Sequence, residues 1–126
     1  MNNSIGGPSN GLVISDDVIA SIAISAVKDV AGVGKIVQRP ANLKGMIGMY
    51  EGALKFVEIN KSDSVYSIKL HITVNDDFKI PVVAAEVQKA VKNAVQEMTS
   101  KVVSKVNVVI AGVESKTDAP YQKNSD

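Results

Sequence analysis

Apolar residues recur at three- and four-residue steps between residues 16 and 30, which predicts an amphipathic helix from Asp16 to Val30. Ser15 can cap this helix through its hydroxyl, and Asp16 and Asp17 place negative charge at the positive end of the helix dipole. We expect the helix to stop near Gly32, which can adopt the left-handed conformation after a last turn. The apolar stripe consists of Val18, Ile19, Ile22, Ala23, Ala26, Val27 and Val30.

The segment from residue 31 to residue 53 has no clear period. It contains five of the nine glycines of the chain, and Pro40 interrupts it further. Glycine is costly inside a helix and proline lacks an N–H, so a long regular helix is not expected. We predict a mobile loop with a short helical turn. Its apolar side chains are Leu43, Met46, Ile47, Met49 and Tyr50.

A hairpin is predicted next. Residues 54–59 form a short strand, residues 60–64 supply turn-forming side chains, and residues 65–74 form the return strand. The return strand alternates strictly, so one face of the sheet is core and the other is exposed or covered by a partner. The core side carries Tyr66, Ile68, Leu70, Ile72 and Val74, and the other side carries Ser67, Lys69, His71 and Thr73.

A second helix is predicted to open at Pro81, a residue favoured in a first turn, and to end at Thr99 and Ser100. A third strand follows and ends at Gly112, with Val102, Val106, Val108 and Ile110 expected on one face. The buried stripe of the helix is predicted to consist of Val83, Ala84, Val87, Val91, Ala94, Val95 and Met98.

These elements predict a single α+β domain with the order α-β-β-α-β, a small three-stranded sheet and both helices packed on one face. The connection from the second strand to the third should be right-handed if those strands are parallel. We expect the domain to span residues 12–113. Residues 1–11 and 114–126 are polar, and we expect a flexible N-terminal segment and a disordered C-terminal tail.

The composition narrows the function. The 126 residues include 14 basic and 13 acidic ones, with Arg39 as the only arginine, so the basic excess typical of nucleic-acid binders is missing. There is no cysteine, which excludes disulfides, thiol catalysis and Cys-ligated metals. His71 is the only histidine. We therefore expect a cytosolic domain that is not an enzyme, with no catalytic residue, no metal and no cofactor.

Membrane insertion is not expected. No apolar run approaches the roughly 20 residues that a spanning helix needs. The first eleven residues contain neither the basic region nor the apolar region of a signal peptide.

Two stretches carry a family resemblance. The first stretch is Ile14–Ala23, followed by Val30-Ala31-Gly32-Val33, and it corresponds to a first helix that ends at a glycine. Ile80–Thr99 leads into Val106–Val113, a helix-to-strand unit. Together they resemble the alkaline shock protein/Gls24 family of Gram-positive bacteria, the envelope stress response family. The chain departs from the family pattern at residues 75–78, in place of a tyrosine-glycine pair, and at residues 100 and 101, in place of glycine and leucine.

The resemblance implies a non-enzymatic envelope stress response protein. Such proteins act as cytoplasmic scaffolds or adaptors through self-association and protein partners, and some are held at the membrane by a partner with its own anchor. The implied partners are further copies of the chain and a membrane-anchored protein. The implied location is the cytoplasm, or the inner face of the cell membrane through that partner.

Three motifs suggest chemistry that their surroundings do not support. Gly32-Val33-Gly34-Lys35 follows a helix and lacks a Ser or Thr after the lysine, so a helix stop is favoured over a phosphate loop. Asp76 and Asp77 offer too few oxygens for a hard cation and fit a solvated turn. His71 has no nucleophile or carboxylate placed beside it to form a triad, and we expect an exposed or edge histidine.

Gly45-Met46-Ile47-Gly48 matches the GxxG pattern with which KH domains clamp a nucleic-acid backbone. Its central residues are apolar and Lys44 is the only adjacent cation, so a loop is favoured and nucleic acid is not the expected partner. A KH-like nucleic-acid-binding module stays the alternative function, and a small-molecule enzyme comes third.

The candidate site is a partner-contact surface in the glycine-rich segment 41–53. Apolar loop residues more often pack on their own domain, but methionine also suits adaptable contact surfaces, and both interpretations remain open. The first two strands also leave sheet edges that can pair with another chain, which favours self-association without setting its stoichiometry. The predicted contact residues are Met46, Ile47, Met49 and Tyr50.

Overall fold

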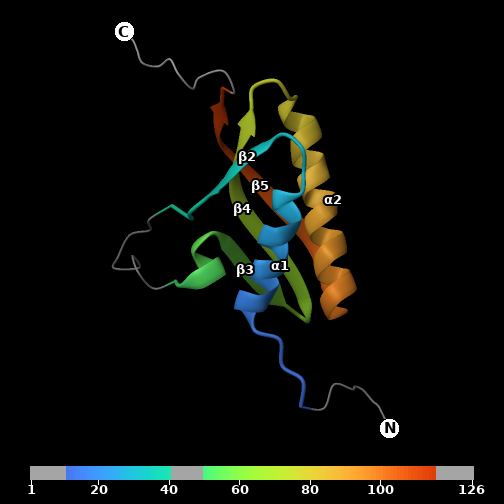
Figure 1. Ribbon diagram of the computed structural model, residues 1–126. Helices are drawn as coiled ribbons and strands as arrows, with labels where there is room; N and C mark the ends of the chain where they lie inside the picture. Colours follow the sequence, from blue (N-terminus) through green and yellow to red (C-terminus); the bar gives the residue numbers. More distant parts are fainter. Residues whose placement is uncertain (1–10, 41–49, 116–126) are drawn as a thin grey trace.

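Two helices cover one face of a four-stranded sheet in the computed structural model, which describes residues 11–40 and 50–115 (Figure 1). The predicted α+β class and the packing of both helices on one face are confirmed. The sheet has four strands instead of the predicted three, because the segment after the first helix adds one. In chain order the elements are α1 (Asp16–Lys28), β2 (Val33–Val37), the 3-10 helix η1 (Gly52–Lys55), β3 (Val57–Ser62), β4 (Val65–Asn75), α2 (Ile80–Thr99) and β5 (Val102–Glu114).

Strand β4 is the centre of the sheet. β5 pairs with β4 in parallel along the whole of β4. The two strands joined through α2 are therefore parallel, which is the arrangement for which a right-handed connection is expected. β2 pairs antiparallel with residues 71–74 of β4, and β3 pairs antiparallel with residues 65–70. Because β5 occupies one side of β4 throughout, β2 and β3 must both lie on the other side, end to end. They are two halves of one edge strand.

The junction between these two halves is unusually close. Val37 pairs with His71, and Val57 pairs with Leu70, the next residue of β4. The chain therefore leaves the sheet after Val37 and returns to it at Val57, at adjacent positions of the central strand, and we call the connection between them the 38–56 excursion. The backbone N–H of Arg39 donates to the carbonyl of Lys55 at 2.8 Å, so the two ends of this excursion remain bonded to each other.

Strand β2 corrects the prediction of a loop over residues 31–53, although η1 does supply a short helical turn. A bulge interrupts β2. Val33 pairs with Val74 and Ile36 pairs with Ile72, so two residues of β2, Gly34 and Lys35, lie opposite the single residue Thr73 of β4. The Thr73 hydroxyl accepts from the backbone N–H of Lys35 at 2.9 Å and donates to a carboxylate oxygen of Glu114 at 2.8 Å. A side chain on Gly34 would collide with that hydroxyl.

The hairpin between β3 and β4 is tighter than predicted. Residues 60–62, predicted as turn, continue β3 and pair with residues 65–67. The loop consists of Asp63 and Ser64 alone, with φ values of 52° and 68°. Positive φ at both central residues is the hallmark of the two-residue turn that matches strand twist. The predicted strand 54–59 was therefore placed about three residues too early.

Strand β5 does not alternate simply. Register shifts leave Ser104 and Ala111 without partners on β4, and each shift reverses which side chains face the core. Val103 is 1% exposed and Val102 is 56% exposed, whereas Val106 is buried, so the placement of Val102 on one face with Val106 was wrong. The strand also runs past Gly112 to Glu114, which belongs to the sheet and not to the tail.

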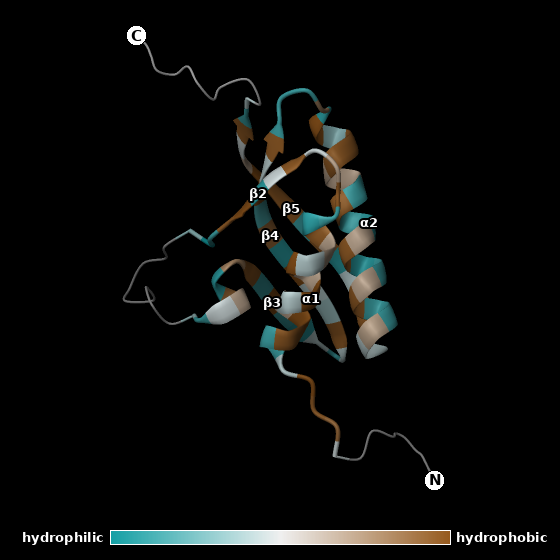
Figure 2. Cartoon of the chain, in the orientation of Figure 1, coloured by the Kyte–Doolittle hydropathy of each residue, from teal (hydrophilic) through white to brown (hydrophobic). Residues whose placement is uncertain are grey.

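The core lies between the helices and the inner face of the sheet, where hydrophobic residues gather (Figure 2). The predicted alternation of β4 is confirmed, as is the capping of α1, with the backbone N–H of Val18 donating to Ser15 Oγ at 3.2 Å. Two predicted members of the helix stripes point outward: Val18 is 48% exposed and Met98 is 72% exposed. The fully buried residues of the two helices are Ile19, Ala20, Ala23 and Val27 on α1 and Val83, Val87, Val91 and Val95 on α2.

Candidate functional site

Of the four predicted contact residues, Tyr50 belongs to the described part of the chain. Met46, Ile47 and Met49 lie outside the described residues, as do Gly45 and Gly48 of the KH-like motif. Tyr50 is half-buried, and its ring lies beneath the guanidinium of Arg39, 3.8 Å from the carbon of that group. Tyr50 is thus held at the point where the 38–56 excursion returns to the sheet.

Arg39 connects both ends of that excursion. Its Nη1 donates to the carbonyl of Leu54 at 3.1 Å, its Nη2 lies 3.7 Å from a carboxylate oxygen of Glu58, and its plane stacks on Tyr50. A guanidinium is suited to these roles, because it is planar, permanently charged and carries five donors in a fixed fork. The only arginine of the chain therefore fixes the base of the excursion.

The outer face of the sheet carries polar side chains around His71. The ring is half-buried on the central strand, between Val37 of β2 and Val109 of β5. The expectation of an exposed or edge histidine was wrong, although the polar side of β4 was predicted correctly. Nδ1 of His71 is buried and has no hydrogen-bond partner among the residues that the structure describes.

The electrostatic surroundings of His71 favour its neutral form. Burial and the ammonium of Lys69 lower the pKa of His71 below its usual 6.5, and the Glu58 carboxylate opposes this effect only in part. Arg39 adds a further small lowering of that pKa.

The remaining sequence motifs occupy turns and a bulge. Gly32, with φ of 95°, turns the chain from α1 into β2, and a Cβ there would lie 2.7 Å from the Phe78 ring. Gly34 belongs to the β2 bulge, and Asp76 lies in the turn before α2. Within residues 11–40 and 50–115, no three His, Asp or Glu side chains are grouped to hold a metal ion.

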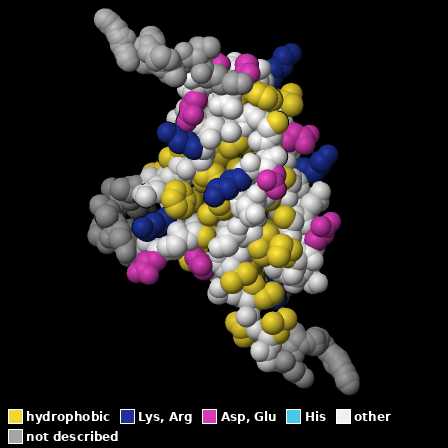
Figure 3. Space-filling view, viewed as in Figure 1, with side chains coloured by type: hydrophobic (Ala, Val, Ile, Leu, Met, Phe, Trp, Pro, Cys, Tyr) yellow, Lys and Arg dark blue, Asp and Glu magenta, His cyan; other side chains and the backbone are white. Residues whose placement is uncertain are grey.

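An apolar hollow runs along the outer seam between α1 and α2, with a volume of about 400 Å³. We call it the helix seam. Figure 3 shows hydrophobic side chains gathered over the helix layer. Contiguous exposed apolar surface on a small domain marks an interaction site more often than single exposed residues do. The apolar side chains that line the helix seam are Val18, Ile22, Ala26, Ala94 and Met98.

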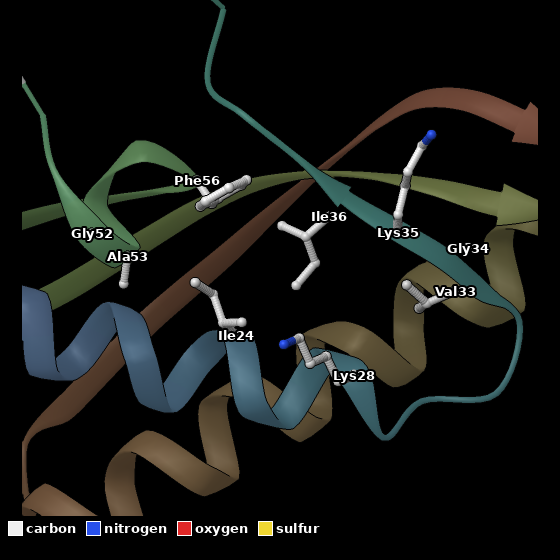
Figure 4. A pocket seen from close by; sticks show the side chains of 9 residues that line it. All are labelled: Ile24, Lys28, Val33, Gly34, Lys35, Ile36, Gly52, Ala53 and Phe56. Carbon is white, nitrogen blue, oxygen red and sulfur yellow. The ribbon is translucent and has the colours of Figure 1, made fainter. Parts of the chain in front are cut away.

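A second and larger hollow, of about 610 Å³, lies between α1, β2 and η1 (Figure 4). We call it the α1–β2 groove. Ile24 of α1 and Ile36 of β2 point toward each other across it, and the amine of Lys28 extends over the same space, whereas Lys35 points away (Figure 4). The apolar walls consist of Ile24, Val33, Ile36, Ala53 and Phe56.

The edge of β5 is partly occupied by side chains from α2. The backbone N–H of Val103 donates to Gln96 Oε1 at 3.0 Å, and Gln88 Nε2 donates to the carbonyl of Val106 at 3.2 Å. Strand addition needs free backbone groups on an edge, so these two bonds oppose pairing with another chain along this part of β5.

Comparison with known proteins identifies the family. Residues 7–115 match the model of the alkaline shock protein 23 family, which is described as having a cell envelope-related function. The chain belongs to this family. The expected family membership is therefore confirmed over most of the sequence, and a cell envelope-related function follows at the level of the family.

One relative extends this match. YqhY of Bacillus subtilis (strain 168), described as an uncharacterized protein, is 30% identical over 104 residues, which cover 82% of this chain and 74% of YqhY.

Among solved structures, one MamM CTD aligns with 79% of this chain and 96% of its own at 16% identity and a TM-score of 0.49. Another aligns with 81% of this chain and 100% of its own at 14% identity and a TM-score of 0.48.

None of the helices in the described ranges combines the length and the apolar character needed to cross a bilayer.

Proposed function

We propose that this chain is a non-enzymatic scaffold or adaptor of the cell envelope, which acts in the cytoplasm through self-association and protein partners. The helix seam carries this proposal, because it leaves Val18 and Met98 about half or more exposed in a largely apolar hollow, which is also lined by Ser21, Ser25 and Asp29. Burying such side chains against another protein gains roughly 25 cal/mol for each Å² of apolar surface. Family membership supports the envelope role.

Self-association through the helix seam is the first arm of the test. We expect the wild-type chain to form oligomers in sedimentation velocity, and Val18→Ser combined with Met98→Ser to shift it to monomers without lowering its melting temperature. Val113→Ser is the matched control, because Val113 is an exposed valine at the end of β5. A wild-type chain that stays monomeric, or association that the double variant leaves intact, would contradict self-association through this surface.

Partner contact is the second arm. Residues 46–50 remain the proposed contact surface for a partner, including a membrane-anchored protein that would bring the chain to the inner face of the membrane. Met46→Ser combined with Ile47→Ser should leave folding intact, abolish capture of such a partner and turn a peripheral fluorescence ring of the tagged protein into a diffuse signal. Loss of folding would instead place these side chains in the core.

A further inference from the structure

The α1–β2 groove has the composition of a ligand site. Its volume of about 610 Å³ falls within the roughly 300–1,000 Å³ of typical small-molecule pockets. Such pockets are mostly apolar with a small number of polar groups that fix orientation, and here Lys28 extends its amine over walls of Ile24, Ile36 and Phe56 (Figure 4). The groove belongs to a different surface from the helix seam.

The η1 wall of the groove is fixed through its backbone. Gly52 has a φ of 59°, which favours glycine, and a Cβ there would lie 3.0 Å from Asp17 Oδ1. The η1 wall is bonded to α1, because the backbone N–H of Ala53 donates to Asp17 Oδ1 at 3.1 Å. The site is therefore formed before any ligand arrives.

Charge along the groove is polarised. Lys28 lies in the last turn of α1 at the β2 end, and Asp17 lies in the first turn beside η1. The eleven residue steps from Asp17 to Lys28 correspond to about 16 Å along a helix that rises 1.5 Å per residue. The Asp17 carboxylate is engaged by η1, while no ion pair of Lys28 is found among the described residues. One end of an apolar slot thus offers a cation.

We propose that the α1–β2 groove binds a free fatty-acid anion, with its carboxylate at Lys28 and its acyl chain along Ile24 and Ile36 toward Ala53 and Phe56. A single cation matches a single negative charge, and one line of apolar residues matches one chain. Asp17 does not line the groove but accepts from the backbone N–H of Ala53, which does, and its negative charge repels a carboxylate placed at that end. This site does not depend on self-association or on the scaffold role.

Decanoate, below its micellar concentration, is the probe. Titration followed by NMR should move the signals of Ile24 and Ile36, with affinity falling as salt is raised. Lys28→Gln should weaken binding about fivefold, as expected for one partly exposed ion pair worth roughly 1 kcal/mol. Lys92→Gln on α2, which removes the same charge away from the groove, should leave affinity unchanged.

Two further arms decide the nature of the site. Ala53→Leu should fill the groove and abolish decanoate binding while the protein still melts cooperatively. Decyltrimethylammonium, with the same chain and the opposite charge, should bind at least tenfold more weakly. Equal binding of both probes, no response of the groove residues to decanoate, or binding only to phosphatidylglycerol vesicles would each overturn the proposal.

Discussion

Arg39 offers the sharpest test of how the fold holds the 38–56 excursion. Arg39→Ala removes a hydrogen bond from a charged donor to the Leu54 carbonyl, a stacking contact with Tyr50 and a longer ion pair with Glu58. The side chain of Arg39 is only 16% exposed, so water replaces these contacts poorly. The substitution therefore acts on a largely buried junction.

The expected loss in the free energy of unfolding on Arg39→Ala follows from these contacts. A hydrogen bond to a charged group contributes roughly 1.5–3 kcal/mol, a cation–π contact roughly 0.5–2 kcal/mol, and a partly exposed ion pair as long as this one at most about 1 kcal/mol. Because one group makes all three contacts, they are not independent, and the expected loss in the free energy of unfolding is about 2–3 kcal/mol. For a core of about 100 residues this lowers the melting temperature by about 10 °C.

Urea unfolding at neutral pH measures this loss, and hydrogen exchange of the Arg39 amide reports opening of its bond to the Lys55 carbonyl. Arg39→Lys should recover less than half of the loss, because an ammonium lacks the planar fork. Lys55→Ala is the matched control, since it removes an exposed cation from the same junction and leaves the backbone bond in place. A loss below about 0.5 kcal/mol for Arg39→Ala, with unchanged exchange, would refute this account.

Two other substitutions test the core and the outer face. Val91→Asp should abolish cooperative thermal unfolding followed by circular dichroism, because it places an unpaired charge at a fully buried position, whereas Lys92→Asp on the exposed side should not. The lowered pKa of His71 means that the unfolded chain binds its proton more tightly, so the folded state loses stability as pH falls from about 6.5 toward the lower folded value. His71→Gln should flatten the pH dependence of the urea midpoint in that window; an unchanged slope would show that His71 does not contribute.

The elements that sequence reasoning predicted well have strong local signals. The strict alternation from Tyr66 to Val74 defines a strand buried on one face, and that strand is the centre of the sheet. Ser15 and Pro81 mark the starts of the two helices through capping and ring geometry, which are properties of adjacent residues.

The missed strand lacks such signals. In β2, the bulge at Gly34 and Lys35 breaks the alternation, and the pairing partner is the far end of β4, almost 40 positions away in the sequence. The same reason explains the errors in β5, where bulges at Ser104 and Ala111 reverse the inward side chains. These features depend on the partner strand, not on local propensity.

The contact surface at Met46, Ile47, Met49 and Tyr50 stays a prediction, and the surroundings of Tyr50 could be predicted only in part. The apolar character of residues 46–50 pointed to the excursion, but nothing in the local sequence indicated that Arg39 would reach across to Tyr50 and Leu54. The presence of one arginine in the whole chain was a usable signal, and it was interpreted only as evidence against nucleic-acid binding. The α1–β2 groove arises from three separated segments and could not be predicted without the pairing of β2.

The split edge strand gives this domain a permissive position for changes in chain length. Val37 and Val57 occupy consecutive places along β4, so the sheet register is the same whatever number of residues joins them. Doubling the length of a flexible connection costs only about 0.6 kcal/mol in closure entropy. Insertions, deletions or a grafted sequence between residues 41 and 49 should therefore leave the pairing of β2 and β3 with β4 unchanged, whereas a residue added to the two-residue hairpin at Asp63 and Ser64 would disturb that turn.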